Sequence, residues 1–354
     1  MPFEFINSII SWFLKKRKHQ IELFLKYPND VQNELLLKLL NSAKNTEFGK
    51  KYDFSSIQNY DDFSKKIPIR QGQQNLFWNS KIKWFAKSSG TTNSKSKFIP
   101  VSEEALTDCH FKAGKDMLCL FINNNDNTKI FKGKSLRLGG SSEVYKDNDT
   151  YFGDLSAILI ENLPFWADFS SAPKQETALM SEWETKMEAI IDETINENIT
   201  SLAGVPSWML VLLNRVLERT GKQNILEVWP NLEVYFHGGV NFNPYREQYK
   251  KLIPKEDFKY YETYNASEGF FAIQDQNNSD ELLLMLDYGI FYEFIPMNEF
   301  DDENSVAIPL SEVKKDVNYA LVITTNGGLW RYLIGDTIKF TSTNPYRIKI
   351  TGRT

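Results

Sequence analysis

The segment Ser88-Ser89-Gly90-Thr91-Thr92-Asn93-Ser94-Lys95-Ser96-Lys97 joins a strand-like run at residues 81–86 to a short extended piece at residues 98–101. Its hydroxyls and free backbone N–H groups are suited to bonding phosphate oxygens, and its lysines are suited to neutralising them. It is not a P-loop, because the sequence contains no GxxxxGK[ST] pattern. A solvated surface loop of the same composition is the alternative interpretation.

Two later strand-like runs end in comparable turns. Residues 232–237 lead into Gly238-Gly239, and residues 258–264 lead into Asn265-Ala266-Ser267-Glu268-Gly269. Ligands of open α/β sheets bind beyond the carboxyl ends of the strands. We therefore expect these three strand ends to border a ligand site.

The order of the remaining elements predicts the fold class. Helical patterns at residues 29–44, 175–196 and 206–220, and a helix that begins after Ser102, alternate with strands in the first two thirds. The last third contains strand patterns, at residues 282–286, 290–295, 319–325, 337–341 and 346–350. We predict an α/β fold of mainly parallel β-sheets flanked by helices, with a more antiparallel β region in the last third.

The turn after residue 264 carries three groups that suit a nucleotide. A tyrosine face such as that of Tyr264 can stack on a purine ring, and Ser267 can reach a phosphate. Glu268 can bind Mg²⁺, which prefers one or two carboxylates together with phosphate oxygens. The alternative is an ordinary junction between a strand and a turn, with a surface glutamate.

Two other turns offer complementary contacts. Asp336 follows Gly335 in the run Trp330-Arg331-Tyr332-Leu333-Ile334-Gly335-Asp336, and a carboxylate at a turn can accept both hydroxyls of a ribose. Gly238 and Gly239 allow the backbone to approach a flat ligand closely. The alternatives are a plain Gly-Asp turn and a tight loop, and we interpret His237 as a structural histidine whose hydrogen bonds are satisfied.

Composition excludes several classes of protein. The net charge of −5 and the pI near 5.5 argue against a general nucleic-acid surface. Cys109 and Cys119 lie ten residues apart on one predicted helix, too far to form a disulfide, and no cysteine-histidine cluster suggests zinc. A reducing, cytoplasmic setting fits this usage.

The N-terminus combines an apolar run at residues 3–14 with the basic cluster Lys15-Lys16-Arg17-Lys18. The charges follow the apolar run, which is the reverse of a signal peptide, and the run is too short to span a bilayer. A helix lying on a membrane surface is one interpretation. We favour a helix packed on the body of the protein, and we expect no stable membrane insertion.

Together these motifs resemble the adenylate-forming superfamily. The segments SSGTT and KSKFIPVS, the GG after a strand, YNASEG, YLIGD and the terminal TGR occur here in the order typical of that superfamily. The run of SSGTT into KFIP, the YxxSEG pattern and GVPSW at residues 204–208 resemble the auxin-responsive Gretchen Hagen family of acyl-acid amido synthetases, in a bacterial member. The resemblance covers nearly the whole chain.

The resemblance implies a role for each matching residue. Ser88, Ser89, Gly90, Thr91 and Thr92 match the phosphate-binding loop, and Lys97 matches its trailing lysine. Gly238 and Gly239 match the turn beside adenine, Tyr264 a residue beside adenine, and Ser267 a phosphate contact. Glu268 matches the Mg²⁺ ligand, Asp336 the ribose-binding aspartate and Arg353 the arginine before an interdomain hinge. Lys97 and Glu268 are the residues that we expect to be catalytic.

The resemblance implies ATP-dependent adenylation of a carboxylic acid, which gives acyl-AMP and pyrophosphate, followed by amide formation with an amino acid. Its partners would be these small molecules with ATP and Mg²⁺, without nucleic acid, and we favour a monomer. Apolar segments at residues 111–121 and 206–213 are candidate walls of the acid pocket. The alternatives are an acyl-CoA or other thioester-forming ligase and a non-catalytic nucleotide-binding module.

The resemblance also implies a domain boundary. Members of the family continue through the hinge into a small C-terminal domain that brings a further lysine to the acyl phosphate. We expect residues 1–354 to be the large N-terminal adenylating domain, ending at that hinge, and to turn over poorly without the second domain.

Overall fold

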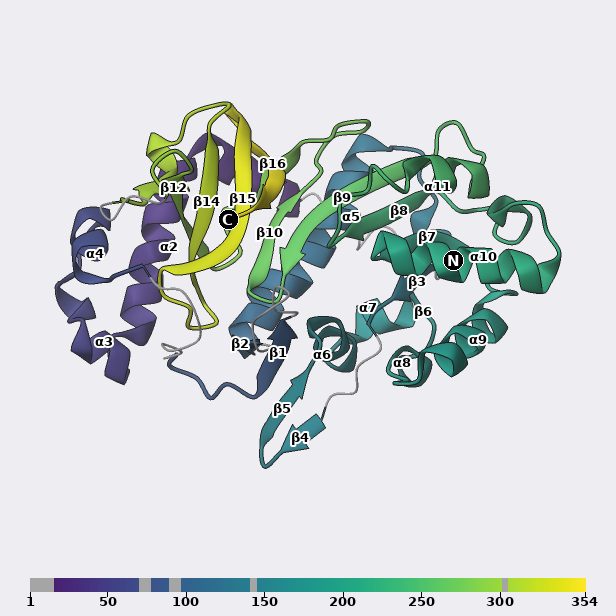
Figure 1. Cartoon of the computed structure of the whole chain (residues 1–354), viewed down its shortest axis with the longest axis horizontal. Coiled ribbons are helices and arrows are strands. Elements are labelled where there is room, and N and C mark those ends of the chain that lie inside the picture. The colour runs from purple at the N-terminus through teal and green to yellow at the C-terminus, as the bar shows by residue number, and fades with distance from the viewer. Residues whose placement is uncertain (1–15, 70–77, 89–96, 141–144, 301–304) are drawn as a thin grey trace.

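The computed structural model describes residues 16–69, 78–88, 97–140, 145–300 and 305–354 (Figure 1). Within these ranges, twelve strands join in one sheet in the order β13-β12-β14-β15-β16-β11-β10-β9-β8-β7-β3-β6, and four strands form a smaller sheet in the order β2-β1-β5-β4. No helix of the described ranges combines the length and the apolar character needed to cross a membrane.

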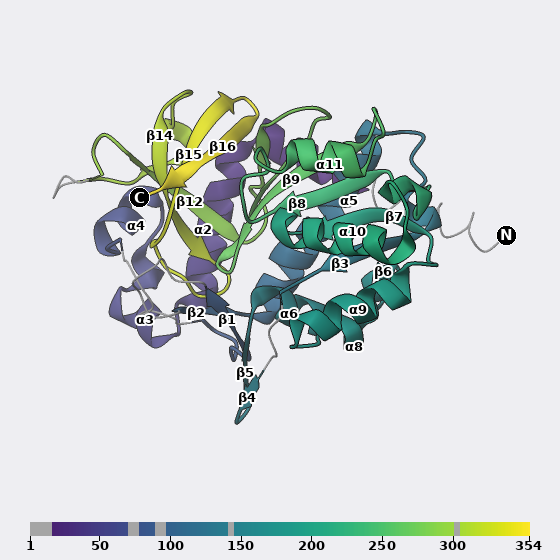
Figure 2. The ribbon, with the colours of Figure 1, turned by 45° about the vertical axis from the view of Figure 1, so that its right-hand side comes forward.

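One end of the large sheet is parallel. Its strands are β6 (Ser171–Ala172), β3 (Lys134–Leu138), β7 (Ile199–Gly204), β8 (Val234–Gly238) and β9 (Lys259–Ala266). Connections between parallel strands need crossovers, which here are α8 (Gln175–Ala178), α9 (Trp183–Thr194), α10 (Pro206–Thr220) and α11 (Arg246–Leu252). Figure 2 shows α9, α10 and α11 along these strands, and their apolar side chains form one core with Leu136, Leu202 and Tyr235.

The opposite face of the same strands is covered by α5 (Lys112–Asn124). Phe121 of α5 packs with Val234, Phe236 and Tyr261 in a separate core cluster. Alternate residues of each strand therefore serve two different layers, as the two-residue period of a strand requires.

The other end of the sheet is antiparallel. It comprises β10 (Gly269–Ile273), β11 (Leu282–Leu284), β16 (Tyr346–Arg353), β15 (Tyr332–Thr343), β14 (Asn318–Thr325), β12 (Ile290–Pro296) and β13 (Ile308–Pro309). β9 and β10 pair as a hairpin, so the direction changes there. The predicted fold class, with mainly parallel strands first and an antiparallel region last, is confirmed.

The small sheet contains β1 (Trp84–Ser88), β2 (Lys97–Val101), β4 (Tyr145–Asp147) and β5 (Thr150–Gly153). Ser88 pairs with Lys97 across β1 and β2. The three glycine- or hydroxyl-rich strand ends therefore come from two sheets, because β1 pairs with β2 and β5 and has no partner among the described strands of the large sheet.

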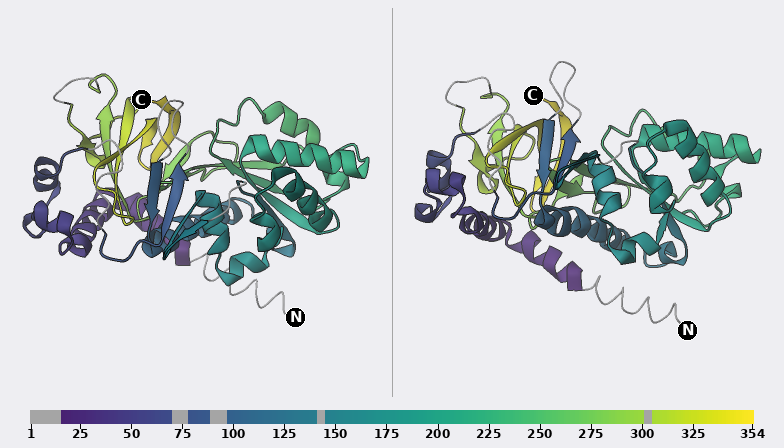
Figure 3. Two further views of the ribbon diagram at one scale, coloured as in Figure 1. Left: turned by 60° about the horizontal axis from the view of Figure 1, so that its bottom comes forward. Right: turned by 90° about the horizontal axis from the view of Figure 1, so that it is seen from below.

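The first described helix spans residues 16–26, and α2 (Pro28–Ala43), α3 (Glu47–Lys51) and α4 (Tyr60–Lys66) follow it. Arg17 lies 2.6 Å from Asp116 of α5 and 2.7 Å from Asp287, and Ile21 and Phe24 are in the main core. The right-hand view of Figure 3 shows this helix at the lower edge of the molecule. Residues 16–26 thus pack on the body of the protein, whereas the apolar run at residues 3–14 lies outside the described residues.

Local signals located some helices better than others. α10 has the predicted bounds, with Pro206 at its start and Gly221 in the left-handed region at φ +66°. Ser102 caps its helix through its hydroxyl, which accepts a hydrogen bond from the Ala105 N–H at 2.9 Å. The single helix predicted at residues 175–196 is wrong, because the chain breaks between α8 and α9, where the Glu182 carboxylate caps α9 through the Glu184 and Thr185 N–H groups.

A buried ion pair ties the N-terminal helices to the antiparallel strands. Arg331 donates to Glu293 of β12 at 2.8 Å, and both side chains are at most 5% exposed. The same guanidinium donates to the Ser64 and Ile67 carbonyls at the end of α4, and the Tyr60 hydroxyl donates to Glu293 at 3.0 Å. These bonds compensate the desolvation of both charges.

Removing one partner of this pair should destabilise the fold strongly. Arg331→Met leaves the Glu293 carboxylate buried without its cation, so we expect the free energy of unfolding to fall by about 3–5 kcal/mol. Lys349→Met, which breaks the exposed pair with Asp280, should change it by less than about 1 kcal/mol. Denaturant unfolding of the two variants measures the difference, and equal effects would show that burial does not govern the Arg331 pair.

Candidate active site

The site is organised by the two-residue turn that joins β9 to β10. Ala266 pairs with Gly269, so Ser267 and Glu268 are the turn itself. Gly269 is closely packed, because a Cβ there would lie 2.6 Å from the Ile290 Cδ1 atom. A larger residue directly after the two predicted ligand-binding residues would require the Ile290 side chain to move.

Tyr264, Asp336 and Arg353 form a connected group beside this turn. The Tyr264 hydroxyl donates to Asp336 Oδ2 at 2.8 Å, and Arg353 Nε lies 3.4 Å from Asp336 Oδ1. Asp336 and Arg353 face each other across β15 and β16. The Tyr264 ring is buried against Phe271, with ring centroids 4.8 Å apart, so its hydroxyl is the part that reaches the site. The Tyr264 bond orients the Asp336 carboxylate.

Glu268 is held in an environment that disfavours its charge. Burial raises its pKa above the ordinary value of 4.5, and the nearby Asp336 raises it further. Lys97 and Arg353 act in the opposite direction. The fold therefore brings Lys97, from the small sheet, close to a carboxylate on the large sheet.

Tyr332 completes this polar group. Burial raises the pKa of its hydroxyl, and its interaction with Glu268 raises it further. Two carboxylates, two cations and two tyrosine hydroxyls from β2, β9, β15, β16 and the connecting turn thus meet at one place. Such a set can bind a nucleotide through its phosphates, its ribose and a divalent cation.

Gly238 and Gly239 lie at the end of β8, next to the start of the same turn. A Cβ on Gly238 would lie 2.5 Å from the Thr263 carbonyl oxygen and 3.0 Å from Asn265 Oδ1, so the strands approach too closely for any side chain. Gly239 has φ +82°, which favours glycine.

His237 differs in part from its predicted role. It is buried and stacks on Phe242 with ring centroids 4.1 Å apart, and burial lowers its pKa to about 3. Its Nδ1 atom has no hydrogen-bond partner among the described residues. Aromatic packing, more than hydrogen bonding, therefore holds this neutral imidazole.

Part of the predicted phosphate loop cannot be placed. Ser88 and Lys97 end β1 and begin β2, whereas Ser89, Gly90, Thr91 and Thr92 lie outside the described residues. Across the described ranges, no three His, Cys, Asp or Glu side chains gather as a metal site.

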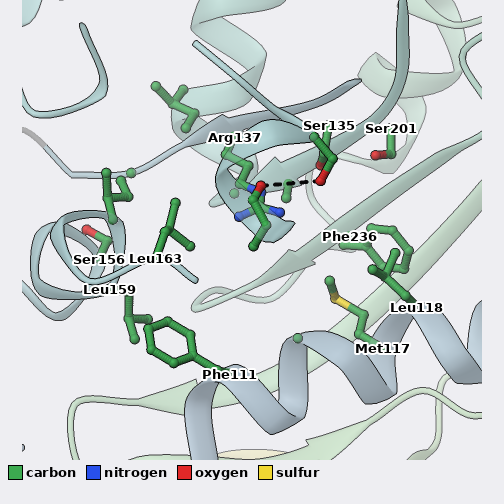
Figure 4. A pocket seen from close by; sticks show the side chains of 18 of the residues that line it. Phe111, Met117, Leu118, Ser135, Arg137, Ser156, Leu159, Leu163, Ser201 and Phe236 are labelled. Carbon is green, nitrogen blue, oxygen red and sulfur yellow. Dashed lines mark hydrogen bonds between the residues drawn. The ribbon is translucent and has the colours of Figure 1, made fainter. Parts of the chain in front are cut away.

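A cavity of about 300 Å³ lies under α5, on the face of the parallel strands away from α10 (Figure 4). Phe111, Gly114, Met117 and Leu118 line it, in agreement with a wall predicted at residues 111–121. Residues 206–213 do not line it, because α10 packs on the other face of the sheet.

The strand wall of this cavity was not predicted. It includes Ser135 and Arg137 of β3, Gly139 directly after this strand, and Ser201 and Ala203 of β7. The alternation in Ser135-Leu136-Arg137-Leu138-Gly139 was the available signal, since it indicates one apolar and one polar face of a buried strand.

Replacing Glu268 by Gln should stabilise the fold at neutral pH, because it removes a charge that burial and Asp336 disfavour. The folded protein binds the proton of the Glu268 carboxyl more tightly than the unfolded chain does. The free energy of unfolding of the wild type therefore falls as the pH rises from the ordinary pKa of 4.5 through the raised pKa of the folded state. We expect Glu268→Gln to unfold a few degrees higher than the wild type at about pH 7.5, and the gain to vanish below about pH 4.5. Thermal unfolding across this range, with exposed Glu218→Gln as control, measures it. A lower midpoint for Glu268→Gln at neutral pH would contradict the assigned environment.

Similar proteins include Arabidopsis thaliana enzymes named indole-3-acetic acid-amido synthetases. GH3.4 is 23% identical over 397 residues, which cover 91% of this chain and 66% of that protein, and GH3.2 is 23% identical over 403 residues, covering 91% and 73%. The chain spans about two thirds of the length of GH3.4.

Solved structures show the same fold. The acyl acid amido synthetase AtGH3.15 in complex with 2,4-DB has a TM-score of 0.75 at 15% identity, covering 92% of this chain and 68% of that one. A 2-hydroxyisobutyryl-CoA ligase has a TM-score of 0.60 at 14% identity, covering 93% and 68%.

Family models match most of the chain. The GH3 family N-terminal domain matches residues 17–258, and the GH3 family central domain matches residues 283–353. The second match includes Asp336 and Arg353, and the first includes Lys97 and both glycines that end β8. The chain belongs to the GH3 family.

Proposed function

We propose that this protein, with ATP and Mg²⁺, adenylates a carboxylic acid and then transfers the acyl group to an amino acid. The observation that carries the proposal is the convergence of Lys97, Tyr264, Glu268, Asp336 and Arg353 at the β9–β10 turn. Membership of the GH3 family supports the proposal, and so does the similarity of the chain to proteins that are named amido synthetases.

In the first half-reaction an oxygen of the acid's carboxylate bonds to the α-phosphorus of ATP. The bond between the α- and β-phosphates breaks, and pyrophosphate leaves. In the second half-reaction the amine nitrogen bonds to the acyl carbon, AMP leaves, and the nitrogen loses a proton. The protein contributes orientation and charge stabilisation to both.

Each of these residues has a separate role in binding the nucleotide. Asp336, oriented by Tyr264, accepts the ribose hydroxyls, and the Gly238-Gly239 turn admits the base. The Lys97 ammonium and the Arg353 guanidinium offset negative charge on the phosphates, and Ser267 and the 88–92 segment bind their oxygens. Glu268 fits a divalent cation, because a cation would offset the burial and the repulsion from Asp336 that raise the pKa of this carboxyl. Bound Mg²⁺ would neutralise phosphate charge.

A thioester-forming ligase is the second candidate, since a CoA ligase shares the fold at a TM-score of 0.60. The molecule that accepts the acyl group distinguishes the amide-forming from the thioester-forming activity. With an acid that supports adenylation, the proposal expects product formation with amino acids and none with coenzyme A.

The adenylation step is tested by acid-dependent exchange of radiolabelled pyrophosphate into ATP across a panel of carboxylic acids. Mass spectrometry of the acyl-AMP gives a second measurement. Nucleotide binding without exchange, for every acid in a broad panel, would instead favour the non-catalytic nucleotide-binding module.

Asp336→Asn should weaken AMP binding about tenfold or more, because a charge-assisted hydrogen bond to the ribose contributes roughly 1.5–3 kcal/mol. Binding of an analogue that lacks both ribose hydroxyls should change far less. Calorimetry with both ligands measures the contrast, and exposed Asp280→Asn is the control. Equal losses for the two ligands would remove Asp336 from the ribose site.

Glu268→Gln should weaken Mg²⁺-ATP binding by roughly tenfold or more while leaving metal-free AMP binding nearly unchanged, because the carboxylate acts through the metal. Wild-type affinity for Mg²⁺-ATP should also fall as the pH decreases through the raised pKa of Glu268, since protonation removes the ligand. Calorimetric titrations with and without Mg²⁺ test both points. An equal loss for Mg²⁺-ATP and metal-free AMP would exclude Glu268 as the metal ligand.

A further inference from the structure

Arg137 is a cation inside the cavity under α5. It belongs to β3, and it shares the cavity with Ser135 of the same strand and with Phe111 and Met117 from the helical side (Figure 4). The rest of the lining is mainly apolar. A guanidinium in such surroundings is unfavourable unless an anion or a set of acceptors meets it.

The described part of the chain provides no such partner. Arg137 makes no hydrogen bond and no salt bridge there, and Asp168 of α7 (Phe165–Phe169), which favours its charged form, is not within the 4.0 Å of an ion pair. Burial lowers the pKa of Arg137 to about 10, so the side chain is still a cation at neutral pH. By contrast, buried Arg331 and Arg17 each make several bonds to carboxylates.

His110 adds a second polar group to the same cavity. It is 7% exposed, and burial lowers its pKa to about 4, so its imidazole is neutral at pH 7. It has no hydrogen-bond partner within the described ranges either. His110 lies in the π-helical segment η2 (Ala105–Phe111), a rare conformation that is frequent at functional sites.

The strand register separates Arg137 from the predicted nucleotide site. Arg137 pairs with Ala203, Ala203 pairs with Phe236, and Gly238 is two residues beyond Phe236. With strands ~4.8 Å apart and ~3.3 Å per residue, the Cα atoms of Arg137 and Gly238 are roughly 12 Å apart. A group bound at Arg137 is therefore distinct from a carboxyl group activated beside the Gly238-Gly239 turn.

We propose that Arg137 binds a second anionic group of the acid substrate, so that the preferred substrates are small dicarboxylic acids or acids with an equivalent distal anion. This inference rests on the proposed adenylating function and specifies its substrate class. One carboxylate lies at the nucleotide, the carbon chain or ring crosses the apolar part of the cavity, and the distal carboxylate accepts from Arg137. His110, which lines the same cavity, is a neutral donor available to the substrate. The cavity volume, at the lower end for ligand pockets, suits a small acid.

Matched pairs of acids test the proposal on the whole chain. Hexanoate is compared with adipate, octanoate with suberate, and benzoate with terephthalate, by calorimetry without nucleotide and by pyrophosphate exchange. A charge-assisted, bidentate contact predicts that the fitting diacid binds about tenfold to a hundredfold more tightly than its monoacid. Arg137→Met should abolish this preference and leave the monoacid unchanged or tighter. Arg219→Met, at an exposed arginine of α10, should keep the wild-type preference.

Arg137→Lys keeps the positive charge but lacks the planar guanidinium, so it should retain part of the preference for diacids. This variant tests the proposal if Arg137→Met does not fold. Equal binding of mono- and diacids, no binding of any diacid, or a diacid preference that survives in Arg137→Met would each overturn the inference. Exchange with monoacids alone would leave the proposed function intact and refute the inference. Diacid binding that depends on Arg137, without exchange for any acid, would support the inference and refute the adenylating function.

Discussion

The two-residue turn at Ser267 and Glu268 joins the parallel and the antiparallel halves of the large sheet. It reverses the sheet from parallel to antiparallel, so both halves share one continuous set of backbone hydrogen bonds. Close approach of the Thr263 carbonyl oxygen leaves no room for a side chain at Gly238, and Gly269 packs closely against the Ile290 side chain. The turn therefore fixes where the carboxyl ends of the parallel strands meet the antiparallel strands that carry Asp336.

Charges in this protein fall into two groups. Arg331 with Glu293, and Arg17 with Asp116 and Asp287, are buried pairs whose bonds join distant segments, and they stabilise the fold. Glu268 and Arg137 differ, because neither makes an ion pair within the described chain, so the burial of each charge is less well compensated. A charge that the fold leaves poorly compensated gains most from a ligand of opposite sign, which is why both belong to proposed binding sites.

The two faces of the parallel strands separate stability from recognition. Leu136 and Leu202 point into the core beneath α9 and α10, whereas Ser135, Arg137 and Ser201, on the alternate positions, line the cavity beneath α5. A single strand thus supports the fold with one side and offers polar groups with the other. Most of the side chains that line the cavity are thus separate from the core beneath α9 and α10, and Leu138 is the β3 residue that contributes to both.

Local patterns and turn residues in the sequence were enough to predict several features of this protein. Proline and glycine set the bounds of α10, the strand patterns of the last third appear as strands, and the order of motifs indicated the GH3 family. Three features follow from the three-dimensional arrangement of the strands. Lys97 lies near Glu268 although it belongs to another sheet, Tyr264 donates a hydrogen bond to Asp336, and Arg137 has no hydrogen-bond or ion-pair partner in the described chain. The break before α9 was not predicted either, because it depends on the Glu182 side chain capping this helix. The hydrophobic period of a segment indicates which face of a helix or strand is apolar. It does not predict which helices and strands pack together, because that depends on strand order and register between segments far apart in the chain.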